Sequence, residues 1–130
     1  MKINIPVSAG ELVDKLTILD IKIENIKDKN KISNIKYEKT HLQHLYEQKW
    51  YHKFVDVEAL RDVLYQINRG LWAIEDAIRI KEKNKEFDEE FVKLARDVYK
   101  TNDKRFETKT KINKLTQSEI VEEKSYESYN

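Results

Sequence analysis

Apolar residues recur along most of the chain at the three- and four-residue spacing that places them on one face of a helix. Lysine- and asparagine-rich runs, KDKNK at 27–31 and KEKNK at 81–85, interrupt this pattern and predict turns. We expect four helices, over about 9–27, 32–53 (or from 33), 56–80 and 88–115. The pattern therefore predicts an all-α fold, an up-down antiparallel bundle with long third and fourth helices.

Capping signals support these boundaries. Ser8 and Glu11 have the spacing of a capping box, and Asp56 and Asp88 are expected to cap the third and fourth helices. The small residues of SAGEL at the first helix could also let an anion approach the backbone N–H groups. Because Ser8 and Glu11 can satisfy those groups, we favour the capping interpretation.

The two ends of the chain lack helical periodicity. Residues 1–7 alternate apolar and polar, which predicts a short extended arm docked by Ile3 and Ile5. Residues 116–130 form a polar, acidic tail that can dock as a short helix from Ser118 and then fray. A chain of 130 residues is long enough for one core, so we expect a single helical domain.

The fourth predicted helix carries an apolar row that becomes polar halfway along. The row consists of Phe91, Ala95, Val98, Asn102, Arg105, Lys109 and Ile112. On other helices, Asp20 is expected to project into the first apolar row and Glu75 to flank the third. Burying unpaired charge is costly, so these groups must pair with each other, with water or with a ligand.

This polar interruption has two interpretations. The favoured one is a buried ion-pair network, Arg105 with Asp20 or Glu75, that fixes the register of the helices. The alternative is a pocket for a small anion, in which Arg105 offers a planar fork and Lys109 a point charge to a phosphate or carboxylate. Asn102 would then orient the ligand.

The first and third helices each carry a second apolar face, opposite the main apolar row. These faces consist of Ile18, Ile21, Tyr65 and Trp72. Such a helix is either sandwiched or part of an oligomer interface, so we expect a homo-oligomer, a dimer for example, formed through these residues. Asp14 lies beside the second face of the first helix. Gly70, inside the third helix, suggests close approach of another backbone.

Composition argues against several functional classes. The net charge of +1 provides no field for nucleic acid, and no apolar run approaches the ~20 residues that a membrane span needs. Glu38 and His41 form the only E-x-x-H element, too few for a di-iron site, so we expect no metal and no cofactor. Tyr99 and Phe106 lie in a basic stretch that could stack bases, but a solvated helix face is favoured. We expect a cytoplasmic protein, in the host cytoplasm if it is viral.

Four stretches, VSAGELVDKLTILDIK, LWAIEDAIRIKE, LARDVYKTNDKRFETKTKIN and SEIVEEKSY, together resemble a family of small uncharacterised helical proteins of bacteria and phages, a domain of unknown function. The resemblance covers nearly the whole chain, and residues 30–65 are least like the pattern. It implies no activity. The charged and polar residues that it places inside family motifs are Glu11, Asp14, Lys15, Asn102, Asp103, Arg105 and Lys109.

The sequence alone does not indicate a specific activity, and it leaves open whether the protein is an enzyme. The function that we favour is a non-enzymatic helical interaction module that self-associates, because its apolar surface exceeds one row per helix. The alternative is a binding protein or enzyme for a small anionic metabolite that uses Asn102, Arg105 and Lys109.

Overall fold

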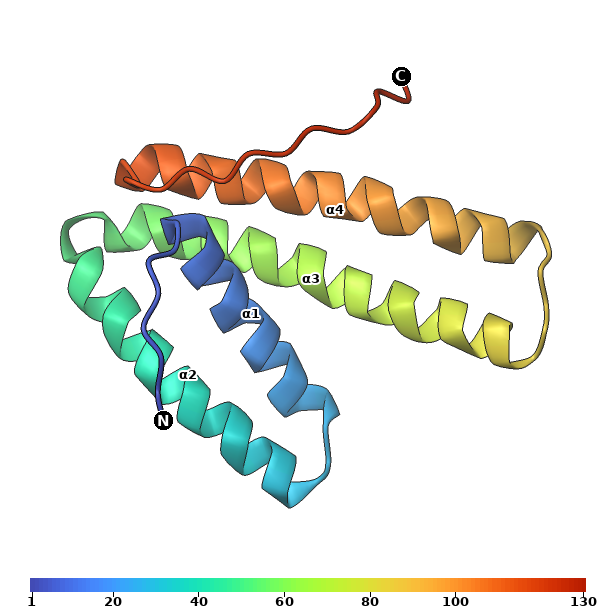
Figure 1. Ribbon diagram of the computed structural model, residues 1–130, viewed down its shortest axis with the longest axis horizontal. Coiled ribbons are helices and arrows are strands. Elements are labelled where there is room, and N and C mark those ends of the chain that lie inside the picture. Colours follow the sequence, from blue (N-terminus) through green and yellow to red (C-terminus); the bar gives the residue numbers. More distant parts are fainter.

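The computed structural model describes all 130 residues and confirms the all-α fold. Its helices are α1 (Ala9–Asn25), α2 (Lys29–Lys49), α3 (Phe54–Lys83) and α4 (Glu89–Thr116), with a short 3₁₀ turn (Tyr51–Lys53) before α3. Each helix runs back along a neighbour, and the structure contains no strand (Figure 1). The prediction of four helices with long third and fourth members is therefore confirmed.

Helix α1 is the central element of the fold. It packs against α2, α3 and α4, whereas α3 and α4 pair with each other as a long hairpin (Figure 1). The shorter α1–α2 pair lies against one end of that hairpin. The bundle consequently has four helices at this end only. A helix with two apolar faces was expected to be either sandwiched or part of an oligomer interface, and α1 is sandwiched between its neighbours.

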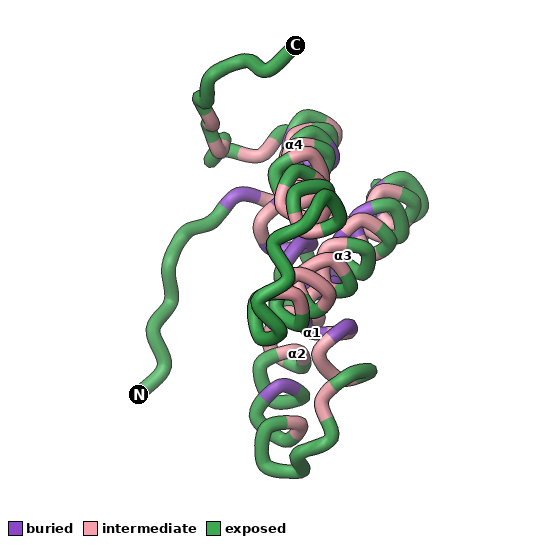
Figure 2. The backbone as a smooth tube through the Cα atoms, turned by 90° about the vertical axis from the view of Figure 1, so that its right-hand side faces the viewer, coloured by how far each residue is buried: buried purple, intermediate pink, exposed green.

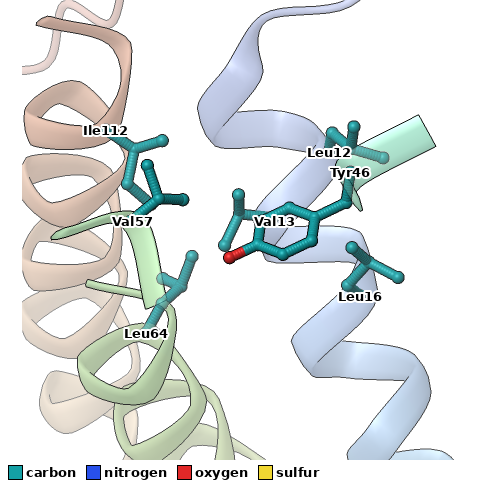
Figure 3. Packing of buried hydrophobic residues seen from close by; sticks show 7 residues of the cluster. All are labelled: Leu12, Val13, Leu16, Tyr46, Val57, Leu64 and Ile112. Atoms are coloured by element: carbon teal, nitrogen blue, oxygen red, sulfur yellow. The ribbon is translucent and has the colours of Figure 1, made fainter. Parts of the chain in front are cut away.

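The hydrophobic core lies where all four helices meet. It is a cluster of seven buried residues, Leu12, Val13, Leu16, Tyr46, Val57, Leu64 and Ile112 (Figure 3). The Tyr46 hydroxyl donates a hydrogen bond to Glu58 Oε1 at 2.6 Å. Burial of the ring, together with this bond, raises the pKa of Tyr46 well above its ordinary value. The tyrosine thus contributes both packing and a satisfied polar group to the core.

The far half of the α3–α4 hairpin has no comparable core. No residue between Gly70 and Glu107 is buried, although the apolar rows of both helices continue there. The reason is helix length: at 1.5 Å per residue the 17-residue α1 covers about 25 Å, and the 30-residue α3 extends about 45 Å. Beyond α1, the two helices are covered by each other and, on α4, in part by the tail.

Two predicted helix starts are wrong. The Asp28 carboxylate accepts hydrogen bonds from two backbone N–H groups, so α2 already begins at Lys29, inside the run predicted to be a turn. Helix α3 begins at Phe54 and not after Asp56, because the preceding 3₁₀ turn leads directly into it. The predicted cap at Asp88 is confirmed by its hydrogen bond with the backbone N–H of Phe91.

Both ends of the chain differ from the prediction. The N-terminal arm is extended but does not dock: Ile3 and Ile5 are 74% and 70% exposed. The arm runs away from the helices, and all of residues 1–7 are exposed (Figure 2). The tail forms no helix from Ser118. Gln117 adopts a left-handed conformation, and the Ser118 N–H donates to the Asn113 carbonyl at 2.8 Å, which ends α4. The tail then runs back alongside α4 (Figure 1).

Candidate functional site

The N-terminus of α1 lies directly against α4. The N–H groups of Ala9, Gly10 and Glu11 donate to Ser118 Oγ (3.0 Å), Asn113 Oδ1 (2.6 Å) and Ser8 Oγ (3.2 Å). A Cβ added at Gly10 would lie 2.6 Å from the carbonyl oxygen of Lys109, so only glycine permits this approach. Because protein oxygens accept from all three N–H groups, no donor there is left for an anion. The cap at Ser8 is confirmed, whereas the reciprocal bond expected of Glu11 is absent, because the Glu11 carboxylate accepts from Lys109 instead.

Asp14 forms the centre of a buried polar network one turn further along α1. Its carboxylate, 1% exposed, accepts from Arg105 Nε at 2.9 Å and Nη2 at 2.5 Å. Asn68 Nδ2 on α3 donates to the same carboxylate at 2.8 Å and to Thr17 Oγ1 at 2.9 Å. These four residues, hereafter the Asp14 network, tie α1 to both long helices. The bidentate bond with Asp14 raises the pKa of Arg105, which stays charged.

Lys109 forms a second ion pair one turn further along α4. Its ammonium donates to Glu11 Oε2 at 2.8 Å and to Glu122 Oε2 of the tail at 3.0 Å. Burial by itself lowers the pKa of Lys109, but the hydrogen bonds with the two carboxylates outweigh it and raise the pKa above its ordinary value. Lys109 thus holds the tail and the start of α1 against α4.

The prediction that Arg105 pairs with Asp20 or Glu75 is wrong. Asp20 pairs instead with Lys39 of α2 at 2.6 Å and with Arg61 of α3 at 3.4 Å. Glu75 pairs only with Arg79, one turn along its own helix. Arg105 reaches Asp14 because α4 packs on the second face of α1, which the sequence could not assign to a neighbour.

The remaining predicted site residues have different environments. Glu11 lies inside the site as a partner of Lys109. Asn102 borders it, with its side-chain oxygen 3.4 Å from Arg105 Nη1. Lys15 is exposed on α1 and forms no ion pair. The structure therefore brings together Glu11, Asp14 and the three polar residues of α4, and separates Lys15 from them.

Three participants were not predicted. Asn68 continues the core row of α3 one turn beyond Leu64, so a polar residue in that row was a usable signal. Thr17, fully buried, donates to the Asp14 carbonyl three residues earlier, a bond that threonines often make inside helices, so its spacing was a usable signal. Glu122 lies in a tail without periodicity, so nothing in the sequence pointed to its contact with Lys109.

The carboxylates of the site outnumber its cations, and each cation already has a carboxylate partner. Two cations, Arg105 and Lys109, meet three carboxylates, those of Glu11, Asp14 and Glu122. No buried side-chain nitrogen or oxygen lacks a hydrogen-bond partner. A cavity of about 310 Å³ between α4 and the tail is lined in part by Asn102, Arg105 and Lys109, but an anion there would have to displace Glu122. The arrangement favours a structural role, and binding of an anionic metabolite stays a prediction.

We expect alkaline pH to weaken the ion pair of Lys109. A group whose pKa is raised on folding contributes stability below its unfolded pKa, about 10.5 for lysine, and loses that contribution as pH rises through the folded pKa. Chemical denaturation of wild type and Lys109→Met, repeated at increasing pH, tests this. The difference in unfolding free energy between them should be constant from about pH 7 to about pH 10 and shrink above it. A difference that grows with pH would contradict the assignment.

The fold and the site together define a small all-α protein in which a buried ion-pair network joins a central helix to a long helical hairpin. The chain belongs to the Family of unknown function (DUF6165), whose model matches residues 1–129. No curated protein and no solved structure matches it. None of the four helices has the length and apolar character that crossing a membrane requires. No three His, Asp or Glu side chains converge as a set of metal ligands.

Proposed function

We propose that the protein is a non-enzymatic helical interaction module that self-associates through the far half of the α3–α4 hairpin. The observation that supports this most directly is the lack of any buried residue between Gly70 and Glu107, although apolar rows continue through both helices. A two-helix hairpin covers at most one side of each apolar row. A second copy would complete the bundle that α1 completes at the other end. A cytoplasmic location remains part of this proposal.

The residues predicted to mediate self-association differ in how accessible they are to a partner. Ile18 and Trp72 line a groove of about 340 Å³ next to the Asp14 network, and Leu71 extends it along α3. Ile21, which is 1% exposed, lies at the same groove but is already covered within the chain. Tyr65 donates a hydrogen bond to Glu24, which satisfies its hydroxyl within the chain. The groove that begins at Ile18 and Trp72 is therefore the part of the predicted surface that a partner can reach.

Charge is compatible with pairing between identical copies. Residues 70–107 contain ten acidic and nine basic side chains, so two such hairpins carry no large charge of one sign. In a twofold dimer the same surface lies on both copies, and mixed charge lets unlike groups face each other. A continuous apolar row flanked by such residues resembles the contact surface of a helical bundle.

Replacement of Trp72 by glutamine tests the proposal. Buried tryptophans are frequent energetic centres of interfaces, and loss of one costs about 2 kcal/mol, or roughly a 30-fold weaker dimer. Sedimentation velocity over a concentration series measures the dissociation constant. Trp50→Gln is the matched control, because Trp50 packs edge-on against the core residue Tyr46 at 5.1 Å and lies outside the groove. It should lower the melting temperature and leave the dissociation constant unchanged.

Two results would overturn the proposal. One is a strictly monomeric wild type at high micromolar concentration. The other is an equal loss of association in both tryptophan variants, since that would trace association to general stability and not to the groove. Far-UV circular dichroism of each variant establishes that it is folded before association is compared.

A further inference from the structure

The tail and α4 line a second cavity, which shares no residue with the groove at Trp72. It has a volume of about 970 Å³. The residues that characterise it are Tyr99, Asp103 and Phe106 of α4 and Lys124, Tyr126 and Tyr129 of the tail. Aromatic rings and a carboxylate therefore face one another across this space, hereafter the tail cleft.

The centre of the tail cleft holds an ammonium group of the protein itself. Lys124 Nζ lies 5.5 Å from the ring centroid of Phe106 and 5.2 Å from that of Tyr126. Its ion-pair partner is Asp103, at 3.7 Å. Two aromatic faces and one carboxylate are the surroundings that proteins use to bind ammonium ions.

Hydrogen bonding and ring packing hold the carboxylate in place. The Tyr129 hydroxyl donates to Asp103 Oδ2 at 2.6 Å, on the oxygen that Lys124 does not contact. The Tyr129 ring meets the Tyr99 ring edge-on at 5.2 Å. Asp103 is thus oriented toward the position of the ammonium group by a tyrosine of the tail.

The charge of the cleft also favours a cation. Its lining includes three carboxylates, those of Asp103, Glu107 and Glu127, and one cationic side chain, that of Lys124. Lys124 belongs to a segment without helical structure, which side-chain contacts hold along α4. Its ammonium can therefore leave the cleft without disturbing the helices or the core.

We propose that the tail cleft is a binding site for an alkylammonium group, and that Lys124 occupies it as an internal ligand. The ligand is a polyamine or a lysine side chain of another protein, which share this chemistry. Binding replaces the Lys124 ammonium between Phe106 and Tyr126 and takes over its ion pair with Asp103. Because the groove at Trp72 contributes nothing to this site, the inference does not depend on self-association.

Removal of the internal ligand gives the most specific test. We expect Lys124→Ala to bind spermidine about tenfold more tightly than wild type, because the ligand no longer competes with an intramolecular ammonium. Amide chemical shifts in ¹H–¹⁵N spectra measure the affinity and locate the change at Asp103, Phe106 and the tail. Lys111→Ala is the matched control: it removes the same charge from an exposed lysine of α4 that lies outside the cleft.

The second substitution is made on the carboxylate. Asp103→Asn, added to Lys124→Ala, should weaken spermidine binding at least tenfold because the cation loses its counter-charge. A parallel titration with Nα-acetyl-lysine amide distinguishes the sources. Binding of this compound identifies a protein lysine as sufficient, and binding of spermidine alone identifies a polyamine.

The proposal is overturned if Lys124→Ala binds spermidine no more tightly than Lys111→Ala does. It is also overturned if sodium chloride at matched ionic strength shifts the same amides equally, because the cleft would then only screen charge. Unchanged spectra outside the cleft show that each variant keeps the fold.

Discussion

Replacement of Asp14 by alanine lowers the free energy of unfolding by about 3–5 kcal/mol, the usual cost of removing one partner from a buried ion pair. The Arg105 guanidinium loses both of its bonds to the carboxylate, and Asn68 loses one acceptor. Arg105 is only partly exposed, so water replaces these bonds incompletely. Urea denaturation followed by far-UV circular dichroism measures the change.

Asp20→Ala is the matched control on the same helix. Asp20 pairs with Lys39 and Arg61 in a more accessible position, so we expect a loss of about 1 kcal/mol or less. Similar losses in the two variants would show that burial of the Asp14 pair adds nothing to its contribution to stability. That result would contradict the structural role assigned to the Asp14 network.

The two glycines of the chain should respond in opposite directions to alanine. Gly10→Ala places a methyl group 2.6 Å from the Lys109 carbonyl oxygen, so α1 must move away from α4 at a cost of about 1–3 kcal/mol. Gly70→Ala meets nothing within 4 Å inside a helix, so it should stabilise by about 0.5–1 kcal/mol. Thermal and urea unfolding of both variants measures the sign of each change in the free energy of unfolding.

Equal effects of the two substitutions would contradict this account of helix contact. A destabilising Gly70→Ala would show that something approaches that position in solution, as the sequence suggested. A neutral Gly10→Ala would show that α1 and α4 are further apart than the structure places them. Measurement at two protein concentrations separates a contact within the chain from one between copies.

The helices could be predicted from the sequence because local periodicity and capping determine them. The four apolar patterns and the caps at Ser8 and Asp88 are local signals, and the structure confirms them. The start of α2 was misplaced because Asp28 was taken as part of a turn, although an aspartate is equally suited to be a cap. The docking of the arm by Ile3 and Ile5 was wrong, since both side chains are exposed, and alternating apolar residues do not show whether a surface is there to receive them.

The polar row of α4 was predicted, but its partners were not. Periodicity shows that Arg105 and Lys109 share a face with Ile112, and all three do lie toward α1. Periodicity does not show which face of α1 they meet. Asp14 lies on the second face of α1, so its pairing depends on the crossing of the helices and not on any spacing within one of them.

The two glycines also show that the sequence does not indicate which helix faces meet. The sequence pointed to Gly70 because glycine is unusual inside a helix, and Gly10 was considered only as a small residue that could let an anion approach the first helix. In the structure only Gly10 touches another backbone. A glycine shows where a side chain is missing, and only the arrangement of the helices shows whether the space is used.

A double-mutant cycle between Asp14 and Arg105 tests the central claim, that the polar row of α4 serves to join α1 to the long hairpin. The unfolding free energies of wild type, Asp14→Ala, Arg105→Ala and the double variant are measured in urea. We expect a coupling free energy of about 1–3 kcal/mol, because either single variant already removes the pair. Losses that add to within about 0.3 kcal/mol would contradict the claim, since two residues that do not interact behave in that way.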